Sequence, residues 1–539
     1  MLSRLVLLST LLLCVIAVPE VKVGNTKVVG RSINSLHQEF FGGIPYAEPP
    51  VGHLRLHNPK PKTLSGLSFD ATQYGKGCLQ VQGIPTQESE DCLTINVLRP
   101  AGVNETAKLP VYFYTYGGGY YNGNSSAYNA SAIVGKSIQR GTPIIYVNFN
   151  YRLGPLGFPQ GYEAATSGVL NLGLKDQLLA LKWVQQNIKC FGGDNTKVTV
   201  GGDTSGSIMN SIQMLNPDFA KVARAAILQS GGPAPVPELF PSEKQPYWQN
   251  FTASVSSCSS VAVSNNTLAC LRKANASEIA SAYPGAVQAA GGVFGFNPSI
   301  DGQFIPELPS KILASGNYAQ IPFIAGTNLD EGTLFTPTTG PFDDAILREF
   351  FVMRIPPIVD AAIVNATITK ILQLYPDDPA LGSPFGTGNE TFGLPTGYKR
   401  VAAFQGDISF QSQRRFLSQT ASCAGIKTWS YIFTQPTPST PPILGVYHTS
   451  EIPYVYGQPS GNSASGLALS NIIVDYWLSF VTSLDPNDGQ GENRPQWPQY
   501  ETQNKVILQL KSNATQVIPD NYRQEQVEFI NSNPGAFRH

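Results

Sequence analysis

One glycine-flanked stretch, 202–206 with the sequence GDTSG, carries the most specific chemical signal in the chain. It follows a β-branched run at 197–201 and opens a segment suited to a helix. A sharp strand-to-helix turn of this kind lifts its central side chain above a sheet, where a hydroxyl can attack an acyl carbon. The usual pattern is G-x-S-x-G, but the central residue here is Thr204. The spacing predicts a nucleophile turn for acyl transfer with threonine in the place of serine.

Threonine at this position has a physical cost. The turn holds its nucleophile at positive φ, where a β-branched residue is an outlier, and the strain is roughly 1–3 kcal/mol. Its methyl group also crowds the path of attack. At about 1.4 kcal/mol per tenfold, these effects would lower the rate by orders of magnitude. Ser205 and Ser207 do not restore the motif, because a shifted register puts Asp203 or Ser205 where a glycine belongs.

A hydroxyl nucleophile needs a base, and the base needs a third group that orients it. In enzymes with this turn, the order along the chain is nucleophile, acid, histidine. Of the five histidines, only His448 lies downstream of the turn, apart from the terminal His539. We therefore predict His448 as the base. The acid is expected on a loop between the two, where Asp330 and Glu331 are both candidates.

Acyl transfer also needs hydrogen-bond donors for the developing oxyanion, worth about 3–4 kcal/mol each. Three glycines at 117–119 directly follow an apolar run, upstream of the turn. Glycine lets backbone N–H groups approach a substrate closely. We predict an oxyanion hole made by the N–H groups of Gly118 and Gly119, with a third donor from Ser205 at the helix start.

The elements that must position these residues alternate between strands and helices. Near-continuous apolar runs at 110–116 and 143–149 suit strands buried on both faces. Apolar residues recur at helical spacing over 171–188, with Asn171 as the predicted N-cap. This order predicts an α/β fold with a mostly parallel sheet, flanking helices and helical insertions, in one domain over 18–539. Further strands are expected at 225–230, 323–326, 428–433 and, as an edge strand, 506–510.

The composition of two other segments predicts their structure. The stretch 40–52, rich in glycine and proline, is expected as a stiff surface segment, and 335–420 as a mainly helical cap. The net charge is -1 and only 14% of residues are charged, which argues against nucleic acid or an anionic membrane surface as the main partner. With 42% hydrophobic residues, the chain can form a large core.

The start of the chain indicates export. Residues 1–17 have a basic beginning, an apolar run and small residues at the end, as expected of a secretory signal peptide, and no later apolar run predicts a membrane span. Closeness favours the disulfides Cys78–Cys92 and Cys258–Cys270, whereas Cys190 and Cys423 either pair or stay as thiols. No cysteine has metal-ligand spacing. Acceptor triplets for N-linked glycans start at Asn104, Asn124, Asn129, Asn250, Asn265, Asn275, Asn365, Asn389 and Asn513.

Taken together, these motifs resemble the type B carboxylesterase/lipase family, which includes cholinesterases and large fungal lipases. The resemblance spans nearly the whole mature chain and rests on short sequence blocks. It implies an α/β-hydrolase fold, hydrolysis of carboxylic esters through an acyl-enzyme without metal or cofactor, Glu331 as the acid, both short disulfides and a buried pair between Glu90 and Arg152. The blocks are 43–47 (GIPYA), 89–93 (SEDCL), 116–119 (YGGG), 150–154 (NYRLG), 191–194 (FGGD), 330–332 (DEG) and His448.

The chain departs from the family pattern at the first disulfide loop and at Thr204. Only 13 residues, 79–91, separate Cys78 from Cys92. A loop this short covers little apolar surface, which favours an esterase with an open gorge over a lid-gated lipase. Tyr120 and Phe294 are the expected substrate contacts. The alternative to a secreted esterase is a catalytically impaired relative that binds a ligand or protein, because threonine replaces the elbow serine.

Overall fold

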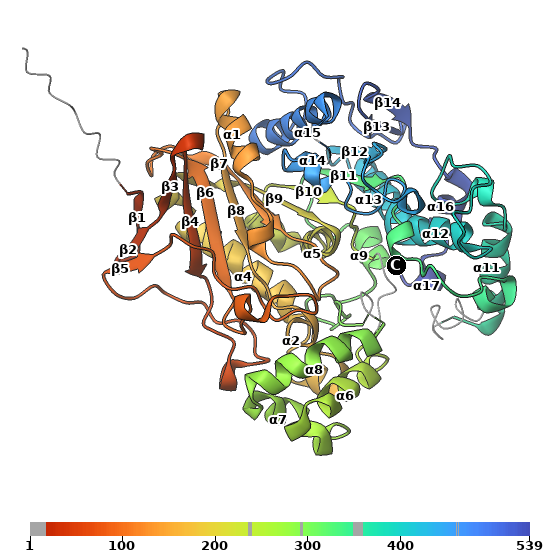
Figure 1. Cartoon of the computed structure of the whole chain (residues 1–539), viewed down its shortest axis with the longest axis horizontal. Helices are drawn as coiled ribbons and strands as arrows, with labels where there is room; N and C mark the ends of the chain where they lie inside the picture. The colour runs from red at the N-terminus through yellow and green to blue at the C-terminus, as the bar shows by residue number, and fades with distance from the viewer. Residues whose placement is uncertain (1–17, 235–239, 292–294, 349–358, 460, 462) are drawn as a thin grey trace, which may run out of the picture.

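The computed structural model of the chain describes residues 18–234, 240–291, 295–348, 359–459, 461 and 463–539 (Figure 1). The predicted signal peptide, 1–17, lies outside the described residues, as does Phe294.

A large sheet of eleven strands forms the centre of the protein. Its middle seven strands, from β8 to β13, run parallel, and antiparallel strands extend both edges. The predicted mostly parallel sheet is therefore present. In spatial order the strands are β14 (Gln516–Pro519), β13 (Val506–Leu510), β12 (Thr428–Phe433), β11 (Phe323–Asn328), β10 (Ala225–Gln229), β9 (Gly193–Asp203), β7 (Leu109–Thr115), β8 (Ile145–Phe149), β6 (Thr94–Pro100), β4 (Gln38–Pro45) and β3 (Arg31–Ile33).

A second, small sheet has three strands from the first 70 residues. Its order is β1 (Glu20–Val23), β2 (Thr26–Val29) and β5 (Ser68–Asp70), with β1 and β2 as an antiparallel hairpin.

Helices cover both faces of the large sheet because its central strands bury alternate side chains on opposite sides. On β7, Val111 and Phe113 belong to one core and Tyr112 and Tyr114 to the other. The first core also contains α4 and α5, and the second contains α1 and α15. These helices are α1 (Ser131–Gln139), α4 (Leu172–Asn187), α5 (Thr204–Met214) and α15 (Ala464–Ser483).

The remaining helices lie in insertions and at the C-terminal end. One group, α6 to α8, forms a separate lobe, and another, with α11, α12, α16 and α17, lies at the far end of the sheet (Figure 1). The expected helical cap at 335–420 therefore has helical structure in its described part. The bounds are α2 (Gly154–Gly157), α3 (Gly161–Thr166), α6 (Gln245–Ser254), α7 (Thr267–Lys273), α8 (Ala276–Ala289), α9 (Pro309–Ser315), α11 (Ala361–Leu374), α12 (Tyr398–Gly406), α13 (Ser412–Cys423), α14 (Ile452–Val455), α16 (Gln524–Asn531) and α17 (Pro534–Phe537).

Three local predictions were wrong. Part of 40–52 is not a surface segment, because residues up to Pro45 continue β4 inside the sheet. The strand at 506–510 is not an edge, since β14 pairs outside it. Asn171 precedes α4 but does not cap it: its side-chain amide donates to Ser299 O at 2.8 Å and its Oδ1 accepts from the Ser299 N–H at 2.9 Å.

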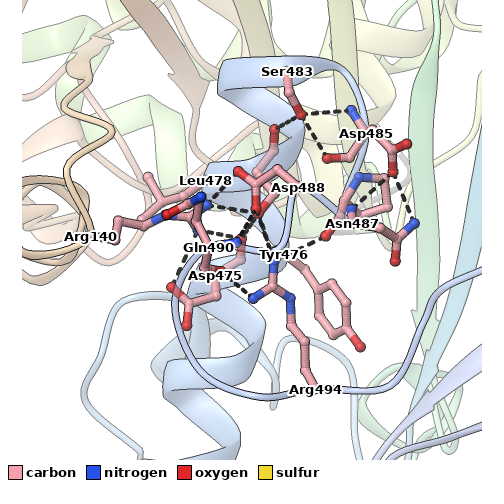
Figure 2. Close-up of polar contacts among 12 residues, drawn as sticks. Arg140, Asp475, Tyr476, Leu478, Ser483, Asp485, Asn487, Asp488, Gln490 and Arg494 are labelled. Carbon is pink, nitrogen blue, oxygen red and sulfur yellow. Dashed lines mark hydrogen bonds and ion pairs between the residues drawn. The ribbon is translucent and has the colours of Figure 1, made fainter.

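A buried ion-pair network fixes the loop that follows α15 (Figure 2). Arg140 at the end of α1 donates to Asp475 at 3.3 Å and to Asp488 at 2.6 Å, and the Arg140 side chain is only 2% exposed. Arg494 donates to Asp488 at 3.3 Å and lies over the ring of Tyr476. The network joins α1, α15 and the loop, so removal of one partner would leave a buried charge less well compensated.

α15 is the one helix among the described residues that is long and apolar enough to cross a membrane. Two thirds (67%) of its apolar window is buried inside the protein, as in the core helix of a globular domain. Its length and composition are therefore weak evidence for a membrane span.

Both predicted short disulfides are present, Cys78–Cys92 and Cys258–Cys270. Cys190 and Cys423 are free thiols, the first half-buried and the second exposed.

Candidate active site

The predicted nucleophile turn lies where β9 ends and α5 begins, and Thr204 is the first residue of the helix. Its φ is +45°, a left-handed conformation that is strained for a β-branched residue. The flanking glycines are required by close approach to β7. A Cβ on Gly206 would lie 2.0 Å from the carbonyl oxygen of Thr115, and one on Gly202 would lie 2.6 Å from the same atom. The sequence GDTSG thus folds as a tight elbow against its neighbouring strand.

The methyl group of Thr204 points at the loop that follows β7. A Cβ on Gly117 would lie 1.8 Å from Thr204 Cγ2, so the methyl fills the space that a side chain at 117 would need. Cγ2 therefore lies against Gly117. A serine at position 204 could not make this contact because it has no Cγ2 atom.

The glycine loop next to the elbow has a backbone conformation that favours glycine at two successive positions. Gly118 has φ of +113° and Gly119 of +63°. Gly117 N–H donates to Asp203 Oδ1 at 3.0 Å, which anchors the loop to the elbow. In the described part of the chain, the N–H groups of Gly118 and Gly119 have no acceptor. Ser205 is the second residue of α5, where a backbone N–H has no carbonyl one turn earlier in the helix. All three donors are thus available to an oxygen above the elbow.

His448 is paired with Glu331, and of the two acidic candidates only Glu331 contacts it. His448 Nδ1 and Glu331 Oε2 are 2.5 Å apart, and both side chains are almost fully buried. Asp330 instead accepts from Ser383 Oγ at 2.8 Å and from the Val446 N–H at 2.9 Å. Asp330 therefore fastens the loop that carries Glu331 to the loop that carries His448.

Two further donors orient Glu331. Its Oε1 accepts from Ser230 Oγ at 2.6 Å and from the backbone N–H of Asn328 at 2.6 Å. Ser230 follows β10 and Asn328 ends β11, so parallel strands deliver both donors to the same edge of the sheet. With Oε2 engaged by His448, both carboxylate oxygens are held, which fixes the plane of the imidazole ring.

The electrostatics favour a positively charged imidazole. Burial lowers the pKa of His448, but the charge of Glu331 and its hydrogen bond more than offset this, so the net pKa lies above its ordinary value. Burial raises the pKa of Asp203, against hydrogen bonds from the hydroxyls of Tyr114 at 2.9 Å and Tyr128 at 3.1 Å. A carboxylate beside the elbow thus faces the same imidazole.

The charges of His448 and Asp203 act on each other, since each shifts the pKa of the other. His448 Nε2 is buried, and nothing in the described chain hydrogen-bonds to it, the Thr204 hydroxyl included. In unliganded enzymes, catalytic hydrogen bonds are often long and tighten when substrate binds. Nε2 is therefore free to accept a proton.

Two aromatic rings enclose the imidazole of His448. The ring centroid of Phe410 is 4.6 Å away and that of Phe335 is 5.0 Å away. Phe410 belongs to a π-helical turn at Asp407–Gln411 between α12 and α13, a rare feature that is frequent at functional sites. The two rings shield one side of the histidine from water.

Sequence reasoning missed the residues that support the pair: Ser230, Asn328, Phe335 and Phe410. A signal existed for Ser230, which closes a predicted strand, but none existed for Phe410 in a helical insertion. Tyr120, a predicted substrate contact, is 3% exposed and packs against Phe158 at 5.0 Å.

The prediction of a buried ion pair between Glu90 and Arg152 was wrong. Arg55 donates to Glu90 at 2.5 and 2.7 Å, and Arg152 donates to Asp176 at 2.7 and 2.8 Å. Each carboxylate is therefore bound by one arginine through two hydrogen bonds. Such a bidentate ion pair is stronger than a pair with a single hydrogen bond.

The loop closed by Cys78–Cys92 is tied to the glycine loop. The Val81 N–H donates to the Tyr121 carbonyl at 3.2 Å, and the Gln82 N–H to Asn122 Oδ1 at 2.9 Å. These contacts hold the disulfide loop beside the site. Over the described residues, no group of three or more His, Cys, Asp or Glu side chains is arranged to hold a metal ion.

Known proteins similar to this chain are named as lipases and an esterase-type protein, EstA. The chain is 34% identical to secreted lipase 1 of Botryotinia fuckeliana, covering 93% of this chain and 90% of the relative. It is 32% identical to secreted triacylglycerol lipase LIP1 of Gibberella zeae, covering 96% and 90%. The crystal structure of Aspergillus niger EstA superposes with a TM-score of 0.82 at 26% identity, covering 97% of this chain and 99% of EstA.

The fold is that of an α/β-hydrolase, with a large mixed sheet flanked by helices, and it is shared with EstA and with PNB esterase. The model of the carboxylesterase family matches residues 17–530, and the chain belongs to that family. Its enzyme class is therefore that of the carboxylic ester hydrolases.

Proposed function

We propose that this protein is a secreted carboxylesterase in which Thr204 is the nucleophile, His448 the general base and acid, and Glu331 the group that orients the base. The observation that carries the proposal is the 2.5 Å contact between Glu331 and His448 Nδ1, while nothing in the described chain hydrogen-bonds to Nε2. Paired nucleophile, base and orienting acid are the requirements of acyl transfer by a hydroxyl.

In the proposed reaction, Nε2 of His448 takes the hydroxyl proton of Thr204 as Oγ1 bonds to the acyl carbon. The N–H groups of Gly118, Gly119 and Ser205 stabilise the oxyanion. His448 then returns the proton to the leaving alcohol, which departs and leaves an acyl-threonine ester. In the second half, His448 takes a proton from water, which attacks the acyl carbon, and then returns it to Thr204 Oγ1 as the carboxylic acid leaves. Glu331 keeps Nδ1 protonated throughout.

The short loop closed by the first disulfide favours an esterase over a lid-gated lipase. The loop between Cys78 and Cys92 is short, closed by a disulfide and hydrogen-bonded to residues 121 and 122. Such a loop has little freedom to open and close over an acyl chain. A jump in activity above the solubility limit of a triglyceride would contradict this preference, whereas smooth saturation by a short soluble ester is expected.

A second function is favoured by one observation, the strained Thr204 with its methyl against Gly117. If these features prevent attack, the protein binds an ester or a protein partner through the same scaffold without turnover. Under that function Glu331 and His448 serve only to stabilise the fold.

The deciding experiment uses the wild type and His448→Ala with a p-nitrophenyl ester and a p-nitrophenyl phosphonate. We expect slow release of p-nitrophenol from the ester, a phosphonate adduct mapped to Thr204 by mass spectrometry, and loss of both in His448→Ala. His57→Ala is the matched control, since His57 is half-buried, far along the chain from the site and outside the triad. Release that survives in His448→Ala, or an adduct at another residue, would refute the proposed roles.

Export and glycosylation belong to the same proposal. Two of the relatives above are named secreted lipases, which supports an extracellular location. Of the nine acceptor asparagines, all except the half-buried Asn124 are exposed, as N-linked glycans require. Recovery from the medium, with a mass decrease after treatment with an N-glycosidase, is the expected result. A product that stays in cells and keeps its mass would contradict both parts.

A further inference from the structure

A second buried carboxyl group lies beside the histidine and has no place in the mechanism above. Glu451 follows His448 by three positions and is 2% exposed. Its Oε2 accepts from Asn328 Nδ2 at 2.5 Å, and its Oε1 is buried with no hydrogen-bond partner among the residues that the structure describes. A buried carboxyl group with one free oxygen is costly to a fold, so a function that offsets the cost is expected.

Asn328 connects this carboxyl group to the triad. Its backbone N–H donates to Glu331 Oε1 at 2.6 Å, while its side-chain amide donates to Glu451. Its carbonyl accepts from Gln411 Nε2 at 3.0 Å. Asn328 is completely buried, so these partners fix its position at the end of β11. Glu451 therefore holds the amide whose backbone orients Glu331.

We propose that Glu451 is a positioning residue of this active site, which holds the Glu331–His448 pair through Asn328 and adds a second negative charge that stabilises the imidazolium formed during turnover. This inference rests on the proposed function, because only a working triad forms that imidazolium. Glu451 needs no contact with substrate for this role.

The charge of Glu451 depends on pH in the working range. Burial raises its pKa, the charge of Glu331 adds to this effect, and the hydrogen bond from Asn328 and the charge of His448 oppose it, with a result of about 7. The carboxyl group is therefore neutral in acidic solution and charged in alkaline solution.

The charged and titratable groups that act on His448 and Glu451 come from three other parts of the fold. Glu331 lies on the loop after β11, and Tyr431 on β12 has its pKa raised by burial, then by the charges of Glu451 and Glu331. Asp203 faces His448 from the elbow and raises its pKa, as Glu331 and Glu451 also do. His448 is the only base among these groups. The charge of Glu451 raises the pKa of His448, and the charge of His448 lowers that of Glu451.

The direct test measures the pKa of His448 by NMR in full-length protein with labelled histidine, with the signal assigned from His448→Gln. In Glu451→Gln the second charge is lost while an acceptor for Asn328 remains. We expect the midpoint of His448 to fall by about one pH unit, as for loss of a nearby charge. Glu88→Gln is the matched control, since burial also raises the pKa of Glu88 but it lies outside the cluster. A change no larger than that of the control would overturn the proposal.

Kinetics provide a second readout. In Glu451→Gln the acidic limb of kcat/KM should move to lower pH with the His448 midpoint. In Glu451→Ala, which also removes the acceptor for Asn328, kcat should fall about tenfold further with KM nearly unchanged. Equal kcat in the two variants would overturn the positioning part. The NMR experiment needs no turnover. A shifted His448 with no hydrolysis would therefore refute the proposed function alone, and hydrolysis with an unshifted His448 would refute the role of Glu451 alone.

Discussion

Replacing Thr204 by serine tests how much the elbow methyl costs the reaction. Thr204 Cγ2 already fills the space next to Gly117 at the glycine loop. A tetrahedral adduct must grow into this region, so the methyl acts like an extra methylene in a packed site, a change that costs about 1–3 kcal/mol. At about 1.4 kcal/mol per tenfold, Thr204→Ser should raise kcat/KM by about 5- to 150-fold.

Stability should respond differently from rate. Serine relieves part of the strain of a β-branched residue at φ +45°, which is roughly 1–3 kcal/mol, but gives up about 0.8 kcal/mol of methyl burial. The free energy of unfolding should therefore stay constant or rise slightly. Thr252→Ser is a matched control, because Thr252 is completely buried in α6 away from the elbow. It should lose stability without any change in rate.

The assay is stopped-flow hydrolysis of p-nitrophenyl butyrate, with the burst giving acylation and the steady state giving turnover. Denaturant unfolding of the same samples gives stability. If Thr204→Ser acylates no faster than the wild type, the methyl does not obstruct attack and the steric reasoning is refuted. If only the serine form acylates, the wild type belongs to the catalytically impaired class.

Three further outcomes are expected. The pKa of His448 lies above its ordinary 6.5, and the base must be neutral to act. We therefore expect kcat/KM to increase with pH, with the midpoint of the increase above pH 6.5. A midpoint below pH 6.5 in a pH–rate series would contradict the role of the Glu331 charge. Ser230→Ala removes one of the two donors to Glu331 Oε1 and should lower kcat about tenfold with little change in KM, whereas an equal rise in KM would indicate a disturbed binding site instead. Asp475→Asn leaves the buried Arg140 with one partner fewer and should lower the free energy of unfolding by about 3 kcal/mol in urea titration; an unchanged midpoint would show that Asp488 alone compensates Arg140.

The sheet was predictable because its signals are local. Continuous apolar runs such as 110–116 are typical of strands covered on both faces. The glycines of 202–206 are needed because the elbow lies so close to the neighbouring strand. Where hydrogen bonding to a distant partner decided the outcome, the prediction was wrong. β14 pairs outside 506–510 with weakly apolar residues, and nothing in the composition of 40–45 distinguishes an internal strand from a surface segment.

In the candidate site, only residues that belong to a motif or that follow from the order along the chain could be predicted. Chain order selected His448, whereas the choice between Asp330 and Glu331 needed either the family resemblance or the geometry, because neighbouring carboxylates on one loop look alike in sequence. The partners of Arg55 and Asp176 escaped because long arginine side chains reach any acid nearby in space. Glu451 and Phe410 have no motif at all, since their roles come from burial beside the imidazole.

The proposed triad is widely spread along the sequence, which has a consequence for biosynthesis. Glu331 and His448 meet across 117 positions, and Asp330 joins their loops only after β11 and β12 have paired. Contacts between such distant segments form late in folding, because closing the intervening chain is entropically costly. A polypeptide still emerging from the ribosome therefore carries a chemically silent Thr204. Ester hydrolysis would begin only once the last third of the chain has docked, so hydrolytic activity reports complete assembly of the molecule.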